Sequence, residues 1–187
     1  MARPSTRTRV LTAALELIGE VGYAGLTMEG IAARAGAGKQ TLYRTWPGKG
    51  AIVFDALLDR SVDPAGAVAV PDSGDLAADL ELLVAATIAD LLEPGQDRLL
   101  RAMMAEVQTD PALADELRDR LLGPQLAAVA ERLRVGGVED PEGAVELLYG
   151  PILHRWLLRT GPFGAGWAAA HVRRVLRAVG RPTDQDH

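Results

Sequence analysis

Apolar residues recur at helical spacing along most of the chain, separated by short breaks rich in Gly and Pro. Over residues 6–22 the apolar positions follow i, i+3, i+4 and i+7, which is typical of a helix with one buried face. Gly22 closes this stripe, at a position where helices commonly end. The pattern therefore predicts a first helix over 6–22, whose buried stripe is Leu11, Ala14, Leu15 and Ile18.

A second helix is predicted from Thr27 to Gly36. Thr27 is a suitable N-cap, and Glu29 lies close to the positive end of the helix. The apolar stripe of this helix consists of Met28, Ile31, Ala32 and Ala35. A third, short helix is predicted at about 39–45. Because so short a helix is unstable alone, it has to pack against the first two.

Breaks and composition along the rest of the chain indicate two domains. Pro47 and Gly48 interrupt the pattern before a fourth helix, and residues 63–74 are rich in Pro, Gly and Ala with no apolar stripe. We interpret this segment as the linker between a small N-terminal domain and a larger one, and we assign the domains to 1–62 and 63–187. Longer helical patterns follow at 75–93, 96–108, 111–134, 140–160 and 165–180. No convincing strand pattern is present, so the expected fold class is all-α.

Composition narrows the class of protein. Hydrophobic residues make up 48% and charged residues 24% of the chain, ordinary values for a globular protein. The absence of cysteine excludes disulfides, thiolate metal sites and a cysteine nucleophile. His154, His171 and His187 lack the spacing of metal ligands, so neither a metal nor another cofactor is expected. No apolar run is long enough for a transmembrane helix or a secretion signal, which predicts no membrane partner and a cytoplasmic location.

Charge is distributed unevenly along the chain, although the total is −5. Residues 1–50 contain seven basic and three acidic groups, whereas the remainder contains 13 basic and 22 acidic groups. The two lysines of the chain, Lys39 and Lys49, both lie in this basic part. This asymmetry indicates that only the first part meets a polyanion. Two alternatives stay open for residues 1–8, which carry Arg3 and Arg7: a disordered arm, or an arm along the DNA backbone.

The predicted third helix has side chains suited to the major groove of DNA. At 3.6 residues per turn one face carries Lys39, Gln40, Tyr43 and Arg44. Leu42 points the other way, towards the stripes of the first two helices. Lysine can bond guanine acceptors and glutamine can pair with adenine, while Thr41 can reach a phosphate or a thymine methyl.

Further residues suit the phosphate backbone. The Tyr43 hydroxyl and Lys49 can bond phosphate oxygens, and the free N–H groups beside Thr27 form another phosphate site. For each residue alone, a solvated helix face is the better interpretation. The set at this spacing instead favours a DNA-reading helix.

Residues 10–57 resemble the DNA-binding domain of the TetR (tetracycline-repressor-like) family of bacterial transcription regulators. The resemblance is carried by Leu26-Thr27-Met28, Ile31-Ala32-Ala33-Arg34-Ala35-Gly36, Lys39-Gln40-Thr41-Leu42-Tyr43-Arg44, Trp46-Pro47 and Lys49. It implies a three-helix domain with a helix-turn-helix, joined by a fourth helix to a larger helical domain that senses a ligand and dimerises. It also implies DNA contacts from Thr27, Lys39, Thr41, Tyr43 and Lys49.

One departure from the family pattern concerns the start of the third helix. Gly38 stands where the family usually has Ser or Thr, so this DNA-facing position has a weaker cap and one fewer hydroxyl for phosphate. The departure encourages an alternative, a helical protein-interaction module that has lost specific DNA binding.

Residues 95–163 bear a looser resemblance to the C-terminal domain of one TetR subgroup. It rests on Ala105-Glu106-Val107-Gln108-Thr109-Asp110-Pro111 and on Leu148-Tyr149-Gly150-Pro151-Ile152-Leu153-His154-Arg155-Trp156-Leu157-Leu158. The resemblance implies a ligand pocket and a dimer. The residues themselves give candidates for the pocket, since methionine adapts to varied apolar ligands and pockets are mostly apolar. The candidates are Leu99, Met103, Met104, Val107, Tyr149, His154 and Trp156, although each alone is more typical of ordinary core.

The last two predicted helices are candidates for a homodimer interface. Residues 147–158 are apolar nearly all round, and Pro151 should kink their helix. The last helix carries a single apolar stripe, Ala168, Val172, Val175, Leu176 and Val179. Two such helices from each subunit could form a four-helix interface about a twofold axis. The alternative is that both helices close the core of one subunit.

These observations together predict a transcriptional regulator that binds double-stranded DNA. The expected form is a repressor on a palindromic operator, dimeric through its last two helices and released by a small-molecule effector. The chain shows no nucleophile–base pair, Gly-rich phosphate loop or metal cluster. An enzyme is therefore not expected.

Overall fold

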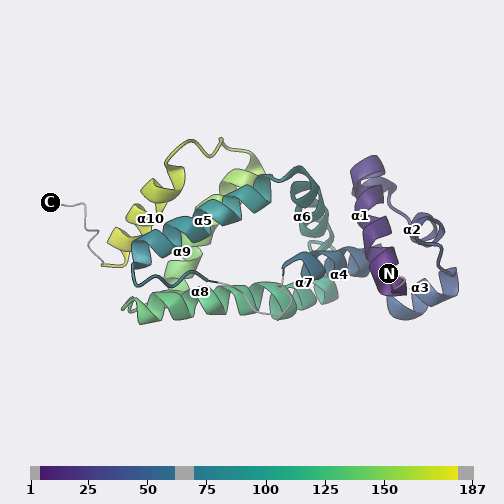
Figure 1. Ribbon diagram of the computed structural model, residues 1–187, viewed down its shortest axis with the longest axis horizontal. Helices are drawn as coiled ribbons and strands as arrows, with labels where there is room; N and C mark the ends of the chain where they lie inside the picture. Colours follow the sequence, from purple (N-terminus) through teal and green to yellow (C-terminus); the bar gives the residue numbers. More distant parts are fainter. Residues whose placement is uncertain (1–4, 62–69, 181–187) are drawn as a thin grey trace. The chain divides into compact units, whose positions relative to one another are not determined.

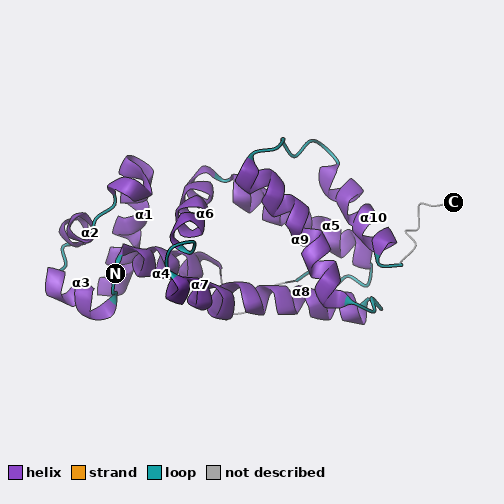
Figure 2. Ribbon diagram, turned by 180° about the vertical axis from the view of Figure 1, so that it is seen from behind, coloured by secondary structure: helices purple, strands orange, loops and turns teal. Residues whose placement is uncertain are grey.

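The computed structural model describes residues 5–61 and 70–180, which form helices joined by loops, with no strand among them (Figures 1 and 2). This confirms the predicted all-α class. The first elements are α1 (Thr6–Gly25), α2 (Met28–Ala35), α3 (Lys39–Thr45), α4 (Lys49–Ser61) and α5 (Leu76–Leu92). They are followed by α6 (Pro94–Glu106), α7 (Pro111–Leu117), a π-helical turn η1 (Arg118–Leu122), α8 (Gly123–Val135), α9 (Pro141–Leu158) and α10 (Trp167–Ala178).

The chain divides into two compact units. The first unit comprises residues 1–66 and 93–121, and the second comprises residues 67–92 and 122–187. In the first unit α6 packs against both α1 and α4, and α7 packs against α4. This grouping differs from the predicted division after residue 62. The physical reason is that the apolar face of α6 belongs to the same core as α1 and α4, which local composition does not reveal.

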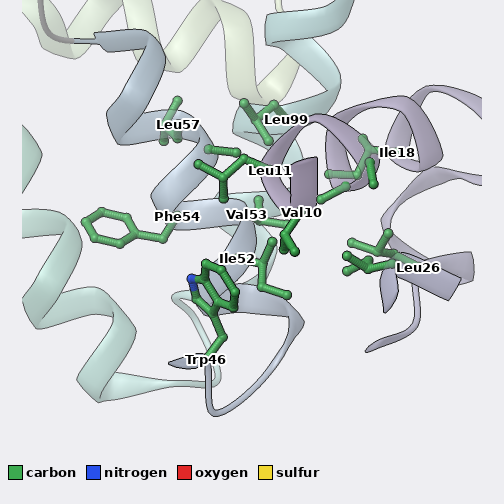
Figure 3. Close-up of a cluster of buried hydrophobic side chains, with 14 of the residues drawn as sticks. Val10, Leu11, Ile18, Leu26, Trp46, Ile52, Val53, Phe54, Leu57 and Leu99 are labelled. Atoms are coloured by element: carbon green, nitrogen blue, oxygen red, sulfur yellow. The ribbon is translucent and has the colours of Figure 1, made fainter. Parts of the chain in front are cut away.

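The core of the first unit is formed by side chains from α1, α2, α3, α4, α6 and α7. Val10, Ile52 and Leu99 are fully buried, and they represent three different helices (Figure 3). Trp46 lies at the edge of this cluster with Phe54 nearby on α4 (Figure 3). Burial of this apolar surface from water is the main contribution that holds the short helices α2 and α3 in place.

Glycine sets the ends of the first two helices. Gly22 has φ of 69°, which interrupts the helical backbone of α1 at the residue where the sequence predicts its end. Gly36 ends α2 in the left-handed conformation with φ of 59°, and its N–H donates to Ala32 and Ala33 carbonyls. Both conformations are strained for residues with a Cβ, so glycine is required there.

Three helices begin with an acidic residue followed by proline. Glu93, Asp110 and Asp140 each accept hydrogen bonds from backbone N–H groups of the first turn that follows them, in α6, α7 and α9. Proline at the next position has no N–H to leave unsatisfied and has its φ fixed near the helical value. Each of these three helix starts therefore has a side-chain cap from the residue that precedes it.

The helix predicted over 111–134 is divided by the π-helical turn η1. Pro124 follows this turn at the start of α8. A proline inside a helix cannot donate to the carbonyl four residues earlier, and its ring clashes with that carbonyl. The wider π turn relieves this conflict.

The second unit contains a buried ion pair between α5 and α8. Asp79 is 3% exposed and accepts hydrogen bonds from Arg132 and from the N–H and hydroxyl of Ser73. Burial works against the carboxylate, but the hydrogen bonds from Ser73 and Arg132 outweigh it and hold the pKa of Asp79 below its ordinary value. The pair joins α5 to α8, and Ser73 adds the segment before α5 to the same cluster.

Candidate nucleic-acid interface

The short helix α3 is anchored through one side and through its C-terminal end. Leu42 is fully buried in the core of the first unit. Trp46 forms the C-terminal cap of α3, is buried, and donates from Nε1 to Asp55 Oδ2 at 3.0 Å. Asp55 also lies 3.6 Å from Arg7 Nε. These contacts fix the orientation of α3 relative to α1 and α4.

The opposite side of α3 faces solvent. Lys39, Gln40, Tyr43 and Arg44 are exposed, and Thr41 is half-buried. Gly38 precedes them in an extended conformation, and α3 has no side-chain cap. The structure therefore brings together the five side chains that the sequence analysis assigned to one DNA-reading helix, and leaves its cap as weak as expected.

Thr27 has a structural role at the start of α2. Its hydroxyl oxygen accepts a hydrogen bond from the Gly30 N–H at 3.0 Å, and its side chain is exposed. A hydroxyl also carries a proton to donate. Thr27 can therefore cap α2 and donate to a phosphate at the same time.

Lys49 makes contacts that the sequence analysis did not predict. Its ammonium group donates to the Tyr23 carbonyl at 3.0 Å and to the Leu26 carbonyl at 3.2 Å. It also lies 4.2 Å from the centre of the Tyr23 ring, a cation–π contact. Two of the three ammonium protons thus hold α4 to the end of α1, which leaves one for the predicted phosphate contact. The carbonyls that end a helix are a natural partner for lysine, but which helix end Lys49 reaches depends on the tertiary fold.

Glu29 is a further residue at this surface that the sequence analysis treated only as a helix-dipole partner. Its Oε1 lies 3.6 Å from Lys39 Nζ and accepts from the Tyr43 hydroxyl at 3.4 Å. The pKa of Glu29 lies below its ordinary value, first because its carboxylate accepts from its own backbone N–H and also because Lys39 and Tyr43 are close.

Several basic groups of the N-terminal part are used within the fold. Arg34 forms hydrogen bonds to both carboxylate oxygens of Glu20, which lower the pKa of that carboxyl. Arg9 donates to the Ala35 carbonyl at the end of α2, and Arg7 pairs with Asp59 at 2.8 Å. On α3 the exposed basic groups are Lys39 and Arg44, of which Lys39 lies beside Glu29. Arg3, which belongs to the N-terminal arm for which two alternatives stay open, lies outside the described residues.

The seven candidate pocket residues fall into both units. Leu99 and Met103 are fully buried in the core of the first unit, and Met104 and Val107 pack against that core. In the second unit Trp156 is buried and His154 is exposed, with its Nδ1 3.3 Å from the Thr160 hydroxyl.

Tyr149 is the remaining candidate and is half-buried between α9 and α5. Burial raises the pKa of Tyr149, against a smaller opposite effect of the Thr87 hydroxyl beside it.

Of the last two helices, α10 buries its apolar stripe, whereas α9 leaves an apolar face exposed. The stripe of α10 is turned inward, with Val172, Val175 and Leu176 buried, and α10 packs against α5 and α9. For these residues the alternative interpretation, closure of the core of one subunit, describes the structure. Helix α9 instead exposes the large apolar side chains Leu147, Leu153, Leu157 and Leu158.

Comparison with known proteins identifies the family whose domains this chain matches. Residues 10–56 match the family described as bacterial regulatory proteins, tetR family, and residues 70–175 match the tetracyclin repressor-like C-terminal domain. The chain is 30% identical over 161 residues to the HTH-type transcriptional regulator YdeS of Bacillus subtilis (strain 168), covering 82% of this chain and 79% of YdeS.

Solved structures show the same fold. The TetR family transcription regulator SCO0332 superposes with a TM-score of 0.73 at 32% identity, covering 93% of this chain and 98% of that one. The multidrug binding protein EbrR, complexed with imidazole, gives a TM-score of 0.67 at 20% identity, covering 98% of this chain and 100% of EbrR.

The comparisons and the geometry agree on the class of protein. Within residues 5–61 and 70–180, no helix combines the length and apolar character needed to cross a membrane. The relatives are helix-turn-helix transcription regulators and not enzymes. The chain belongs to the TetR family of DNA-binding transcription regulators.

Proposed function

We propose that the protein is a repressor that binds a palindromic operator as a homodimer and leaves it when a small-molecule effector binds. The observation that carries the proposal is the two-sided character of α3. Leu42 is fully buried on one side, while Lys39, Gln40, Tyr43 and Arg44 are exposed on the other. A short helix with this division is suited to the major groove, where lysine, glutamine and arginine read base edges.

The exposed face of α9 supports dimer formation. Leu147, Leu153, Leu157 and Leu158 lie on the same helix with Gly150, which has no side chain to hinder close approach. Exposed large apolar side chains gathered on one helix are typical of an interface, and twofold homodimers are the commonest soluble oligomers. Two copies would present two α3 helices to two half-sites of one operator.

The effector is proposed to bind in the second unit. Tyr149 on α9 and Thr87 on α5 place a phenol beside a hydroxyl, and ligand sites contain a few polar groups of this kind. The structural relative EbrR is named as a multidrug binding protein, which supports a small molecule as the class of effector. Release requires only that the effector favours a dimer whose two α3 helices no longer match the half-sites.

Selection of binding sites from random duplexes, followed by affinity measurements at several salt concentrations, tests the DNA proposal. We expect recovery of palindromic sequences and an affinity that falls steeply with salt. Lys39→Ala and Tyr43→Ala should reduce that affinity, whereas Arg134→Ala in the second unit removes a cation from a different surface and should not. Selection without palindromes, or equal effects of all three substitutions, would contradict the proposal.

A further inference from the structure

Glu29 is an acidic side chain within a surface otherwise suited to a polyanion. It is the only acidic residue between Glu20 and Asp55, and its carboxylate is exposed. DNA phosphates repel a carboxylate at this position. Glu29 therefore lowers the affinity of the protein for DNA unless another role offsets the repulsion. Its two contacts indicate what that role is.

Both contacts of Glu29 are with residues assigned to DNA recognition. Lys39 and Tyr43 lie one turn apart on α3, and Glu29 Oε1 is shared between the Lys39 ammonium at 3.6 Å and the Tyr43 hydroxyl at 3.4 Å. Glu29 itself lies in the first turn of α2. The carboxylate thus links the start of α2 to two successive turns of the reading face of α3.

We infer that Glu29 is a positioning residue that restrains Lys39 and Tyr43 and lowers the affinity of the protein for non-operator DNA; this inference rests on the proposed function. On an arbitrary duplex the Lys39 ammonium has only phosphate to gain, and it must leave or share the carboxylate to reach it. On the operator, Lys39 donates to a base from the position in which Glu29 holds it, so the ion pair does not have to be broken. The same carboxylate therefore reduces non-specific binding more than specific binding, which raises discrimination.

The substitution Glu29→Gln tests this role, because it removes the charge and keeps the shape. We expect the affinity for a random duplex to rise about two- to fivefold, the range of an exposed ion pair. The affinity for the selected operator should rise less, so that the ratio of the two affinities falls. The matched control is Glu142→Gln, which makes the same change of net charge at an acid paired with Arg134 in the second unit.

A double-mutant cycle with Lys39→Gln separates restraint of Lys39 from a general charge effect. In the Lys39→Gln background the additional Glu29→Gln substitution should change random-duplex affinity by clearly less than in the original protein. Both side chains are exposed, and thermal unfolding should show that all variants keep the fold.

Two results would overturn the inference while leaving the proposed function intact. One is that Glu29→Gln changes the affinity for a random duplex no more than Glu142→Gln does. The other is that Glu29→Gln weakens operator binding alone, which would make the carboxylate a direct reader of a base. Failure to select any operator would instead contradict the proposed function, and the random-duplex comparison would still decide the role of Glu29.

Discussion

The two lysines of the chain have different environments, although the sequence places both in the motif that resembles TetR. Lys39 is exposed on α3 with Glu29 as its neighbour. Lys49 is half-buried at the start of α4 and donates to the carbonyls of Tyr23, near the end of α1, and of Leu26, which follows α1. Residue type and spacing do not distinguish these roles, because the carbonyls that Lys49 reaches are more than twenty residues away in the chain.

Substitution of the two lysines by methionine should separate stability from DNA binding. Lys49→Met keeps the aliphatic part and removes two charge-assisted hydrogen bonds and a cation–π contact, so we expect a loss of about 1–2 kcal/mol in the free energy of unfolding. Lys39→Met should cost less than about 0.5 kcal/mol, as other exposed substitutions do. It should instead weaken DNA binding and reduce its salt dependence. Urea unfolding and binding titrations on both variants measure this, and equal losses of stability would refute the assignment.

The Asp79–Arg132 pair predicts a defined dependence of stability on pH. The pKa of Asp79 lies below its ordinary value of 3.8, so its stabilising contribution is complete above that pH and is lost as pH falls towards the lower, folded-state pKa. We expect Asp79→Asn to be less stable than the original protein at pH 7. The difference should shrink at pH 3, when measured by urea unfolding at both pH values. A difference that stays constant would show that the charge of Asp79 does not stabilise the fold.

At the scale of helices, the apolar periodicity of the sequence and its Gly and Pro breaks predict much of what the structure shows. The short helix was predicted at 39–45 and is found at Lys39–Thr45, because Gly38 and Pro47 flank an apolar–polar pattern with one buried residue. The helix predicted over 111–134 is interrupted by η1, because Pro124 cannot continue the regular hydrogen bonding of the turn before it, and an apolar pattern does not reveal this. The packing of α6 on α1 and α4 could not be predicted, because an apolar stripe does not identify its partner.

The missing cap of α3 predicts a comparison between two substitutions at one position. Gly38 has φ of −69°, and a Cβ added there would lie 3.7 Å from the Thr41 hydroxyl, an ordinary contact. Both Gly38→Ser and Gly38→Ala therefore fit the backbone, but only serine can accept from an N–H of the first turn. We expect the serine variant to be more stable than the alanine variant by about 1 kcal/mol and more stable than the original by a few tenths. Thermal unfolding of the three proteins tests this, and equal stability of the two variants would show that α3 gains nothing from a cap.

At the scale of the whole molecule, the proposed function requires a second copy of the chain. The apolar residues that α10 contributes are mostly buried within one subunit, so of the last two helices it is α9 that presents an exposed apolar face to a partner. Leu153 and Leu157 are each 47% exposed and lie one turn apart on that face. Leaving four leucines in water would forgo the free energy that their burial provides, on the order of 25 cal/mol for each Å².

A charge on this face should therefore separate the subunits and weaken operator binding through the loss of the second half-site. We expect Leu157→Glu to shift the protein from dimer to monomer at micromolar concentration, because an unpaired carboxylate is costly to bury in an apolar interface. Its affinity for a full palindrome should fall tenfold or more, roughly the scale on which bivalent binding acts, while binding to an isolated half-site stays unchanged. The matched control is Leu82→Glu on α5, where the leucine is 61% exposed. It should change neither the oligomeric state nor the affinity for the full palindrome. Sedimentation and titration with both duplexes measure these outcomes, and a Leu157→Glu protein that remains dimeric would exclude α9 as the interface.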